Sequence, residues 1–345
     1  IPVWSGDELC SFEKLPYDNF GTKNTGEDGS GLLYWLKLLF GGSDFRNVKP
    51  PGESSYVRYA LKKGLRQQYE MGENSLKYGM IASTDTHIAA PGLVMEKNYP
   101  GHGGAGMGSR EAIRLLPDEM EFNPGGLAVL YAEENSRDAL FAAMRRREAY
   151  ATSGTRPTLR FFGGWEYPQA MCQSAGLLEQ AYAGGVPMGG DLPPRVAAAA
   201  QGPRFLVSAQ ADAGTAQYPG TPLQRLQVVK GWYANGELHE QVLDVAGGAN
   251  EAQVDPDSCA QTGSGHAQLC TVWQDADFDA EHPAFYYARL LENPSCRWSQ
   301  QICVAAGVQC DDPATIGEGL AGCCAETHQP VQQERAWSSP IWYTP

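Results

Sequence analysis

Residues 77–91, KYGMIASTDTHIAAP, contain the feature around which the rest of the chain is organised. Residues 78–82 form a short apolar run of strand length, and a polar cluster from Ser83 to His87 follows at once. This order predicts a buried strand that carries chemistry at its carboxyl end. Side chains of an extended segment alternate between two faces, so we expect Asp85 and His87 to point the same way.

A carboxylate and an imidazole on one face can share a divalent cation or act as an acid and base pair. The pattern is short, and it also fits a polar strand end in which Asp85 caps a turn and His87 packs. Both interpretations stay open from this D-x-H pattern alone.

Length and charge limit the function classes. The 345 residues are enough for two domains with their own cores, or for one large domain. The chain has 40 acidic and 26 basic side chains, and this net charge of -14 disfavours nucleic acid as a partner. No run approaches the roughly 20 apolar residues that a membrane span needs.

The nine cysteines lie mostly in the last quarter of the chain, and none belongs to a C-x-x-C pair. The zinc-ribbon spacing is therefore absent, and disulfides in an oxidising compartment are the better interpretation. We accordingly expect a periplasmic or secreted protein. The opening residues 1–4, IPVW, are not a signal peptide, and the chain begins as if something had been removed.

Helical and strand patterns are clearest between residues 54 and 147. Apolar residues from Tyr56 to Leu65 recur at helical spacing, and Gly72 is expected to end this helix. A strand is predicted over residues 127–131, and a helix over about 136–147 with a buried stripe formed by Leu140, Phe141 and Met144.

Two further residues are candidates for substrate binding. His102 lies in the glycine-rich loop 90–108, where it is either an exposed loop histidine or part of a loop that closes over a substrate. Arg156 follows Ser-Gly-Thr, where it can hold a carboxylate or phosphate group of a substrate, or pair with an acidic neighbour in a turn.

From residue 163 the chain changes to short β-like runs separated by Gly and Pro, which predicts a β-sandwich. Asn235-Gly236 lies between two such runs and is a strong hairpin signal. A cysteine-rich insertion, residues 296–324, is expected near the edge. Surface or packing roles are predicted for the histidines of this half, which are His239, His266, His282 and His328.

The order of several sequence blocks resembles the DUF3604 family, which is related to the PHP-type (polymerase and histidinol phosphatase) metallohydrolases. The blocks include STDTH (83–87), YPGHGGAG (99–106), GVPMGGDL (185–192), PAFYYARLLENP (283–294) and QERAWSSPIWYTP (333–345). The resemblance implies a distorted α/β barrel with divalent metals at its strand ends, where a last motif S-D-x-H binds metal. Residues Ser83 to His87 match this motif with one extra Thr, which implies that Asp85 and His87 are ligands of zinc, manganese or iron.

The sequence departs from this family pattern in one respect. PHP-type enzymes also supply an H-x-H pair from an early strand, and this chain contains no H-x-H. Residues 1–162 are therefore expected to be the C-terminal part of a PHP-like α/β barrel. Either an upstream half, in a separate chain or segment, supplies the other ligands, or this chain is a fragment with an incomplete site. Residues 163–345 are expected to form a mainly antiparallel β-sandwich with a disulfide-rich segment, 259–324.

The resulting functional hypothesis is a metal-dependent hydrolase of PHP or amidohydrolase type. Its substrate would be a small molecule or oligosaccharide that contains a phosphoester, carboxylic ester or amide, and Asp85 and His87 would also be the catalytic residues. The alternative is a non-catalytic protein whose β-sandwich binds a carbohydrate or a partner. The supply of Trp and Tyr suits sugar stacking, although aromatic residues are equally ordinary core material.

Overall fold

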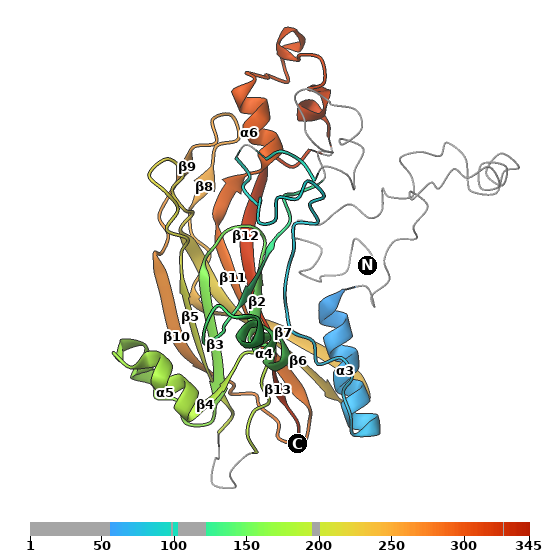
Figure 1. The fold of residues 1–345 in the computed structure, drawn as a ribbon, viewed down its shortest axis with the longest axis vertical. Coiled ribbons are helices and arrows are strands. Elements are labelled where there is room, and N and C mark those ends of the chain that lie inside the picture. The colour runs from blue at the N-terminus through green and yellow to red at the C-terminus, as the bar shows by residue number, and fades with distance from the viewer. Residues whose placement is uncertain (1–55, 98, 103–121, 195–200, 327) are drawn as a thin grey trace, which may run out of the picture. The chain divides into compact units, whose positions relative to one another are not determined.

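The computed structural model describes residues 56–97, 99–102, 122–194, 201–326 and 328–345. The chain separates into two compact units, Ile1–Ala60 and Leu61–Pro345. Of the first unit only residues 56–60 are described, at the start of helix α3 (Val57–Met71). The second unit contains all the predicted site residues and both of the larger β-sheets (Figure 1).

The larger sheet has seven strands, and all its pairings are antiparallel. Its order is β1-β2-β12-β11-β6-β7, and the short strand β13 also pairs with β11. The strands are β1 (Leu127–Leu130), β2 (Ala149–Thr152), β6 (Leu223–Ala234), β7 (Glu237–Gly247), β11 (Ala284–Cys296), β12 (Val331–Ser338) and β13 (Ile341–Tyr343). Segments from before and after residue 162 thus share one sheet.

The smaller sheet has four antiparallel strands in the order β10-β5-β3-β4. They are β3 (Thr158–Gly164), β4 (Gly185–Pro187), β5 (Arg204–Gln210) and β10 (Gln268–Gln274). A separate two-stranded sheet joins β8 (Gln253–Val254) and β9 (Gln261–Thr262). The predicted domain boundary at residue 162 falls inside β3.

The two larger sheets pack face to face, as in a β-sandwich. Leu226, Val228 and Tyr286 of the larger sheet share one core with Phe161 and Phe205 of the smaller sheet. The described strands are antiparallel and the helices few, so an α/β barrel is not visible in this part of the chain. The antiparallel β-rich character predicted for the second half extends to strands β1 and β2 as well.

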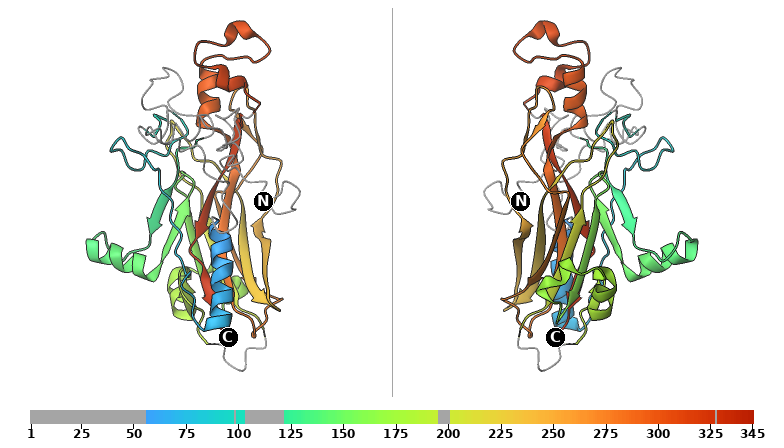
Figure 2. Two further views of the ribbon diagram at one scale, coloured as in Figure 1. Left: turned by 90° about the vertical axis from the view of Figure 1, so that its right-hand side faces the viewer. Right: turned by 90° about the vertical axis from the view of Figure 1, so that its left-hand side faces the viewer.

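Helices cover the outer faces of both sheets. Leu61 and Leu65 of α3 pack on Val229 and Phe285 of the larger sheet. On the smaller sheet, α5 (Leu177–Gly184) and the 3-10 helix η4 (Gln169–Gln173) form a second cluster, which includes Phe162. Figures 1 and 2 show α3 and α5 on opposite sides of the sheets. The predicted helix ends as expected, because Gly72 adopts a positive φ of 79°.

The expected strand over residues 78–82 is wrong. These residues belong to no sheet, and Tyr78 is 46% exposed and Ile81 65% exposed. Met80 is the residue that attaches the segment, since its N–H donates to Ser339 Oγ at 2.8 Å and its side chain packs on the outer face of the larger sheet. The segment therefore lies over a sheet face whose strands already pair with one another.

Helix α4 (Arg137–Arg146) forms where the sequence predicted it. Ser136 caps its first turn, with the Oγ atom accepting from the Ala139 N–H at 3.2 Å. The predicted buried stripe is wrong, because Phe141 is 61% exposed and Met144 56% exposed. The helix lies beside β1, the edge strand of the sheet, and Figure 2 shows it projecting away from the sandwich.

The Asn235-Gly236 hairpin is confirmed. Both residues have positive φ, 52° and 82°, and they join β6 to β7. This is the backbone conformation that a two-residue type I′ turn requires, and it explains why Asn and Gly occur there.

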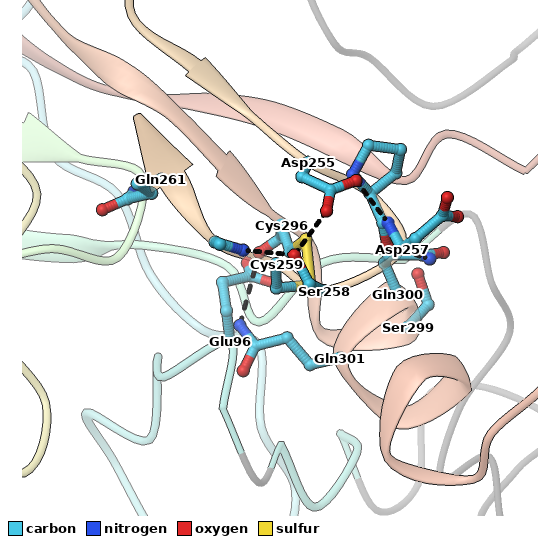
Figure 3. The surroundings of a disulfide bond; sticks show 12 residues. Glu96, Asp255, Asp257, Ser258, Cys259, Gln261, Cys296, Ser299, Gln300 and Gln301 are labelled. Atoms are coloured by element: carbon cyan, nitrogen blue, oxygen red, sulfur yellow. Dashed lines mark hydrogen bonds between the residues drawn. A yellow bond between two sulfur atoms is a disulfide. The ribbon is translucent and has the colours of Figure 1, made fainter. Parts of the chain in front are cut away.

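Four disulfides confirm the predicted oxidised state of the cysteines. They join Cys172 to Cys270, Cys259 to Cys296, Cys303 to Cys323, and Cys310 to Cys324. Cys10 lies outside the described residues. In Figure 3 the Cys259–Cys296 bond ties the turn at Asp255 to the end of β11.

The disulfide-rich segment also contains helix α6 (Trp298–Ala305) and the 3-10 helices η5 (Pro313–Thr315) and η6 (Ala321–Cys324). Trp298 is fully buried beside the Cys303–Cys323 bond. The described residues include no helix that is long and apolar enough to cross a membrane.

Candidate functional site

Residues Ser83 to His87 form a tight irregular loop and not the end of a strand. The Asp85 N–H donates to Ser83 Oγ at 3.3 Å, and the Thr86 N–H donates to Thr84 Oγ1 at 3.2 Å. Asp85 adopts a left-handed φ of 53°. The side-chain alternation expected for an extended segment therefore does not apply between Asp85 and His87.

The loop is held from two sides by backbone hydrogen bonds. The Gly126 N–H donates to the Ser83 carbonyl at 2.9 Å, and the His87 N–H donates to the His102 carbonyl at 2.7 Å. A side chain at Gly125 would clash with the loop, because its Cβ would lie 2.6 Å from the Ser83 oxygen. The Asn123-Pro124-Gly125-Gly126 turn is thus shaped to receive this loop.

Two of the predicted site residues, His87 and His102, are consequently neighbours. His102 is half-buried, and its Nδ1 atom shares a 2.6 Å hydrogen bond with the buried Tyr99 hydroxyl. The imidazole also makes an edge contact with the ring of Phe122, with centroids 5.7 Å apart. Sequence reasoning named His102 but missed Tyr99, which lies three residues before it.

An aromatic and disulfide-bonded cluster supports this histidine. The Tyr99 ring lies 5.2 Å from that of Trp298, which packs beside the Cys303–Cys323 bond. The Trp298 indole N–H donates to the Phe122 carbonyl at 2.8 Å, and its backbone N–H donates to the Glu96 carboxylate. The disulfide-rich segment therefore holds Tyr99, and through it His102, in place.

Arg156 contacts the chain between His87 and His102. Its Nη2 atom donates to the Gly92 carbonyl at 3.3 Å, and its backbone N–H donates to Asp212 Oδ2 at 2.9 Å. The arginine is exposed. Backbone contacts of residues 87–102 thus bring His87, His102 and Arg156 to one part of the molecule.

The ligand set for a metal is incomplete in the described residues. No hydrogen bond or ion pair with another described residue engages the carboxylate of Asp85 or the imidazole of His87, and both side chains are exposed. No group of three His, Cys, Asp or Glu residues suited to a metal occurs in the part of the chain that the structure describes, and a catalytic metal commonly has three protein ligands.

A cavity of about 370 Å³ lies elsewhere, beside the C-terminal half of α3. Its lining is polar and includes Gln67, Asn74 and Lys77, but none of the four predicted site residues. The cavity contains no histidine and no paired carboxylates, so we do not assign the chemistry to it.

The remaining histidines make the packing and surface contacts that were predicted for them. His239 stacks on Trp232 with centroids 5.1 Å apart, and His282 lies 3.0 Å from Asp279. Burial lowers the pKa of His328, whose Nδ1 lies 3.1 Å from the Cys323 carbonyl. His266 is exposed.

The tryptophans of the described residues give no support to the carbohydrate-binding alternative. That alternative needs an exposed row of indole rings on the sandwich. Each described tryptophan is instead buried or half-buried: Trp165, Trp232, Trp273, Trp298, Trp337 and Trp342. The Trp165 indole, for example, packs edge-on against Phe278 and donates to the Pro193 carbonyl.

We expect Tyr99→Phe to release the His102 ring with little effect on global stability, because one hydrogen bond is worth about 1 kcal/mol. Nitrogen chemical shifts of the His102 imidazole should change in this variant. Tyr343→Phe is the matched control, since that hydroxyl donates to the Ala280 carbonyl at 2.8 Å, outside the loop. Identical His102 signals in wild type and Tyr99→Phe would contradict the positioning role.

Comparison with known proteins identifies one family. The family model described as "Protein of unknown function (DUF3604)" matches residues 42–345. No curated protein matches the chain. No solved structure matches it either.

Proposed function

The chain belongs to the DUF3604 family, and from this premise we propose that it is the C-terminal part of a metal-dependent hydrolase related to the PHP and amidohydrolase types. The substrate would carry a phosphoester, carboxylic ester or amide. The observation that supports this proposal most is the 2.7 Å hydrogen bond from the His87 N–H to the His102 carbonyl. It joins His87 of the candidate metal-binding motif to His102 of the candidate substrate loop, fifteen residues later in the sequence.

Each predicted residue has a distinct role in this proposal. Asp85 and His87 would hold a divalent ion such as zinc, manganese or iron, and such an ion lowers the pKa of bound water and polarises the scissile group. His102, held by Tyr99, would orient a polar portion of the substrate. The exposed guanidinium of Arg156 would bind an anionic portion, for which its planar donors are suited.

The remaining metal ligands would come from an upstream half of the barrel, which is the partner that we propose for this chain. Two protein ligands hold a catalytic metal poorly, and the PHP pattern places further histidines and carboxylates before the S-D-x-H motif. The four disulfides suit an oxidising compartment, so we propose a periplasmic or secreted location.

The test is hydrolysis by the complete protein, including the upstream half, of nitrophenyl phosphate, nitrophenyl acetate and an anilide. Asp85→Asn and His87→Gln should each lower kcat/KM by at least about 100-fold, the upper end of what losing an outer-shell partner of a metal costs. His266→Gln, a change at an exposed histidine outside the loop, should leave kcat/KM within about two-fold. Equal activity of Asp85→Asn and wild type would refute the proposal.

A further inference from the structure

Glu292 has a buried carboxyl group in which one of the two oxygen atoms lacks a hydrogen-bond partner among the described residues. It lies in β11 and is 0% exposed. Thr155 Oγ1 donates to its Oε1 atom at 2.8 Å, whereas its buried Oε2 atom has no hydrogen-bond partner among the residues that the structure describes. A buried polar atom without a partner is rare in folded proteins and commonly marks the place of an ion or a water molecule.

Asp212 is a second carboxylate near Glu292, because Thr155 binds Glu292 and the next residue, Arg156, binds Asp212. Asp212 accepts the backbone N–H of Arg156 at 2.9 Å and that of Gly214 at 2.8 Å. The pKa of Glu292 is raised to about 8, mainly by burial. The hydrogen bond from Thr155 partly offsets this rise, and the negative charge of Asp212 adds to it. No ion pair with a cationic side chain of the described residues reaches either carboxylate.

The backbone of β11 is irregular at this residue. Its pairing with β6 shifts register between Leu291 and Glu292, and its pairing with β12 shifts between Leu291 and Pro294. Such β-bulges re-aim a side chain and are over-represented beside functional sites. Here the irregularity coincides with the residue whose carboxyl group points toward Thr155.

We propose that Glu292, Asp212 and Thr155 form a binding site for a hard divalent cation of the calcium class. The two carboxylates and the hydroxyl offer only oxygen donors, which calcium prefers, and backbone carbonyls and water can complete its coordination. Buried carboxylates are normally paired with a cation or bound to a metal. The site contains neither Asp85 nor His87, although Asp212 accepts the backbone N–H of Arg156, the residue proposed to bind the substrate.

Calorimetric titration of the metal-stripped full chain with calcium chloride at pH 8 tests this site. We expect one calcium ion per chain. Glu292→Gln should abolish binding, and Thr155→Val should weaken it by about ten-fold, which corresponds to about 1.4 kcal/mol of binding free energy. Asp244→Asn removes a carboxylate on β7 that pairs with Arg225, and it should bind calcium as wild type does.

Proton competition gives a second readout. Below pH 8 the calcium affinity should fall by up to about ten-fold per pH unit, because Glu292 must lose its proton to bind. Charged residues on the strands that flank Glu292 include Arg225 of β6 and Glu334 and Arg335 of β12, and Arg156 follows Thr155. Asp85→Asn should retain calcium binding, which separates this site from the hydrolytic centre.

Two outcomes would overturn the proposal. One is the absence of calcium binding by the wild-type chain at pH 8. The other is calcium binding by Glu292→Gln with the wild-type affinity, which would place the ion elsewhere. Near-UV circular dichroism of both Glu292→Gln and Thr155→Val establishes that a loss of binding is not a loss of the fold.

Discussion

Replacing Cys172 and Cys270 by serine is expected to lower the free energy of unfolding by about 4 to 5 kcal/mol, because this disulfide closes a loop of about 100 residues. The two cysteines are 98 residues apart and join η4 to the edge strand β10. They also border the cluster on the outer face of the smaller sheet. Without the bond, the unfolded chain gains the entropy of a long loop, and the helices on this face lose a covalent attachment.

Urea unfolding measures the free energy of unfolding of wild type and of the variant in which Cys172 and Cys270 are serine. The matched comparison is the replacement of Cys310 and Cys324, which are only 14 residues apart and should cost about 3 kcal/mol. The long-range bond should therefore contribute roughly 1 to 2 kcal/mol more than the short-range one. A loss below about 1 kcal/mol for the Cys172–Cys270 variant would contradict the expected contribution of this bond.

The second large effect is a dependence of the free energy of unfolding on pH, which is caused by Glu292. Its pKa is raised in the folded state from the ordinary 4.5 to about 8, so the folded chain binds this proton more tightly than the unfolded chain does. The resulting stabilisation is fully present below pH 4.5, decreases steadily as the pH rises above that value, and is lost once the pH exceeds about 8. Between pH 5 and pH 8, we expect wild type to lose about 3 kcal/mol relative to Glu292→Gln, since one pKa unit corresponds to about 1.4 kcal/mol.

This dependence is measured as the difference in unfolding free energy between wild type and Glu292→Gln at several pH values, with a chelator present. The chelator matters because a bound cation would stabilise the ionised carboxylate and reduce the effect. The amide of Gln can keep the Thr155 hydrogen bond but cannot ionise. A difference that stays constant from pH 5 to pH 8 would contradict the raised pKa of Glu292.

Local patterns in the sequence predicted several elements correctly, because their signals are confined to a few residues. Helix α3 has a regular apolar spacing and a terminating glycine, and α4 has a capping serine at residue 136. The Asn235-Gly236 turn requires positive φ at both positions, which few other residue pairs tolerate. The use of cysteines as disulfides followed from their number and the absence of metal-binding spacing.

Predictions that depended on distant parts of the chain failed or stayed incomplete. The apolar run at residues 78–82 has the composition of a strand, but the sheet face beneath it offers no strand edge for pairing. The spacing of Phe141 and Met144 predicts one apolar face of α4 but not what covers it. Eight cysteines can pair in about a hundred ways, so the Cys172–Cys270 bond was not predictable from sequence.

In the candidate site, too, the sequence identified individual residues but not their arrangement in space. The residue types at Asp85, His87, His102 and Arg156 identified them as chemically interesting, but only the fold places His102 against His87. Tyr99 and Trp298 lie about 200 residues apart and meet in one cluster. Glu292 gave no signal at all, because its importance depends on a bulge in β11 and on the distant Thr155 and Asp212.

The most direct test of the central claim is the metal content of the complete protein, measured by mass spectrometry for wild type and Asp85→Ala. We predict bound zinc, manganese or iron in wild type, and at least about one ion per chain fewer in the variant, because Asp85 supplies one of the metal ligands. His266→Ala, at an exposed histidine, should retain the wild-type content. Equal metal content in wild type and Asp85→Ala would contradict the assignment of Asp85 and His87 as metal ligands.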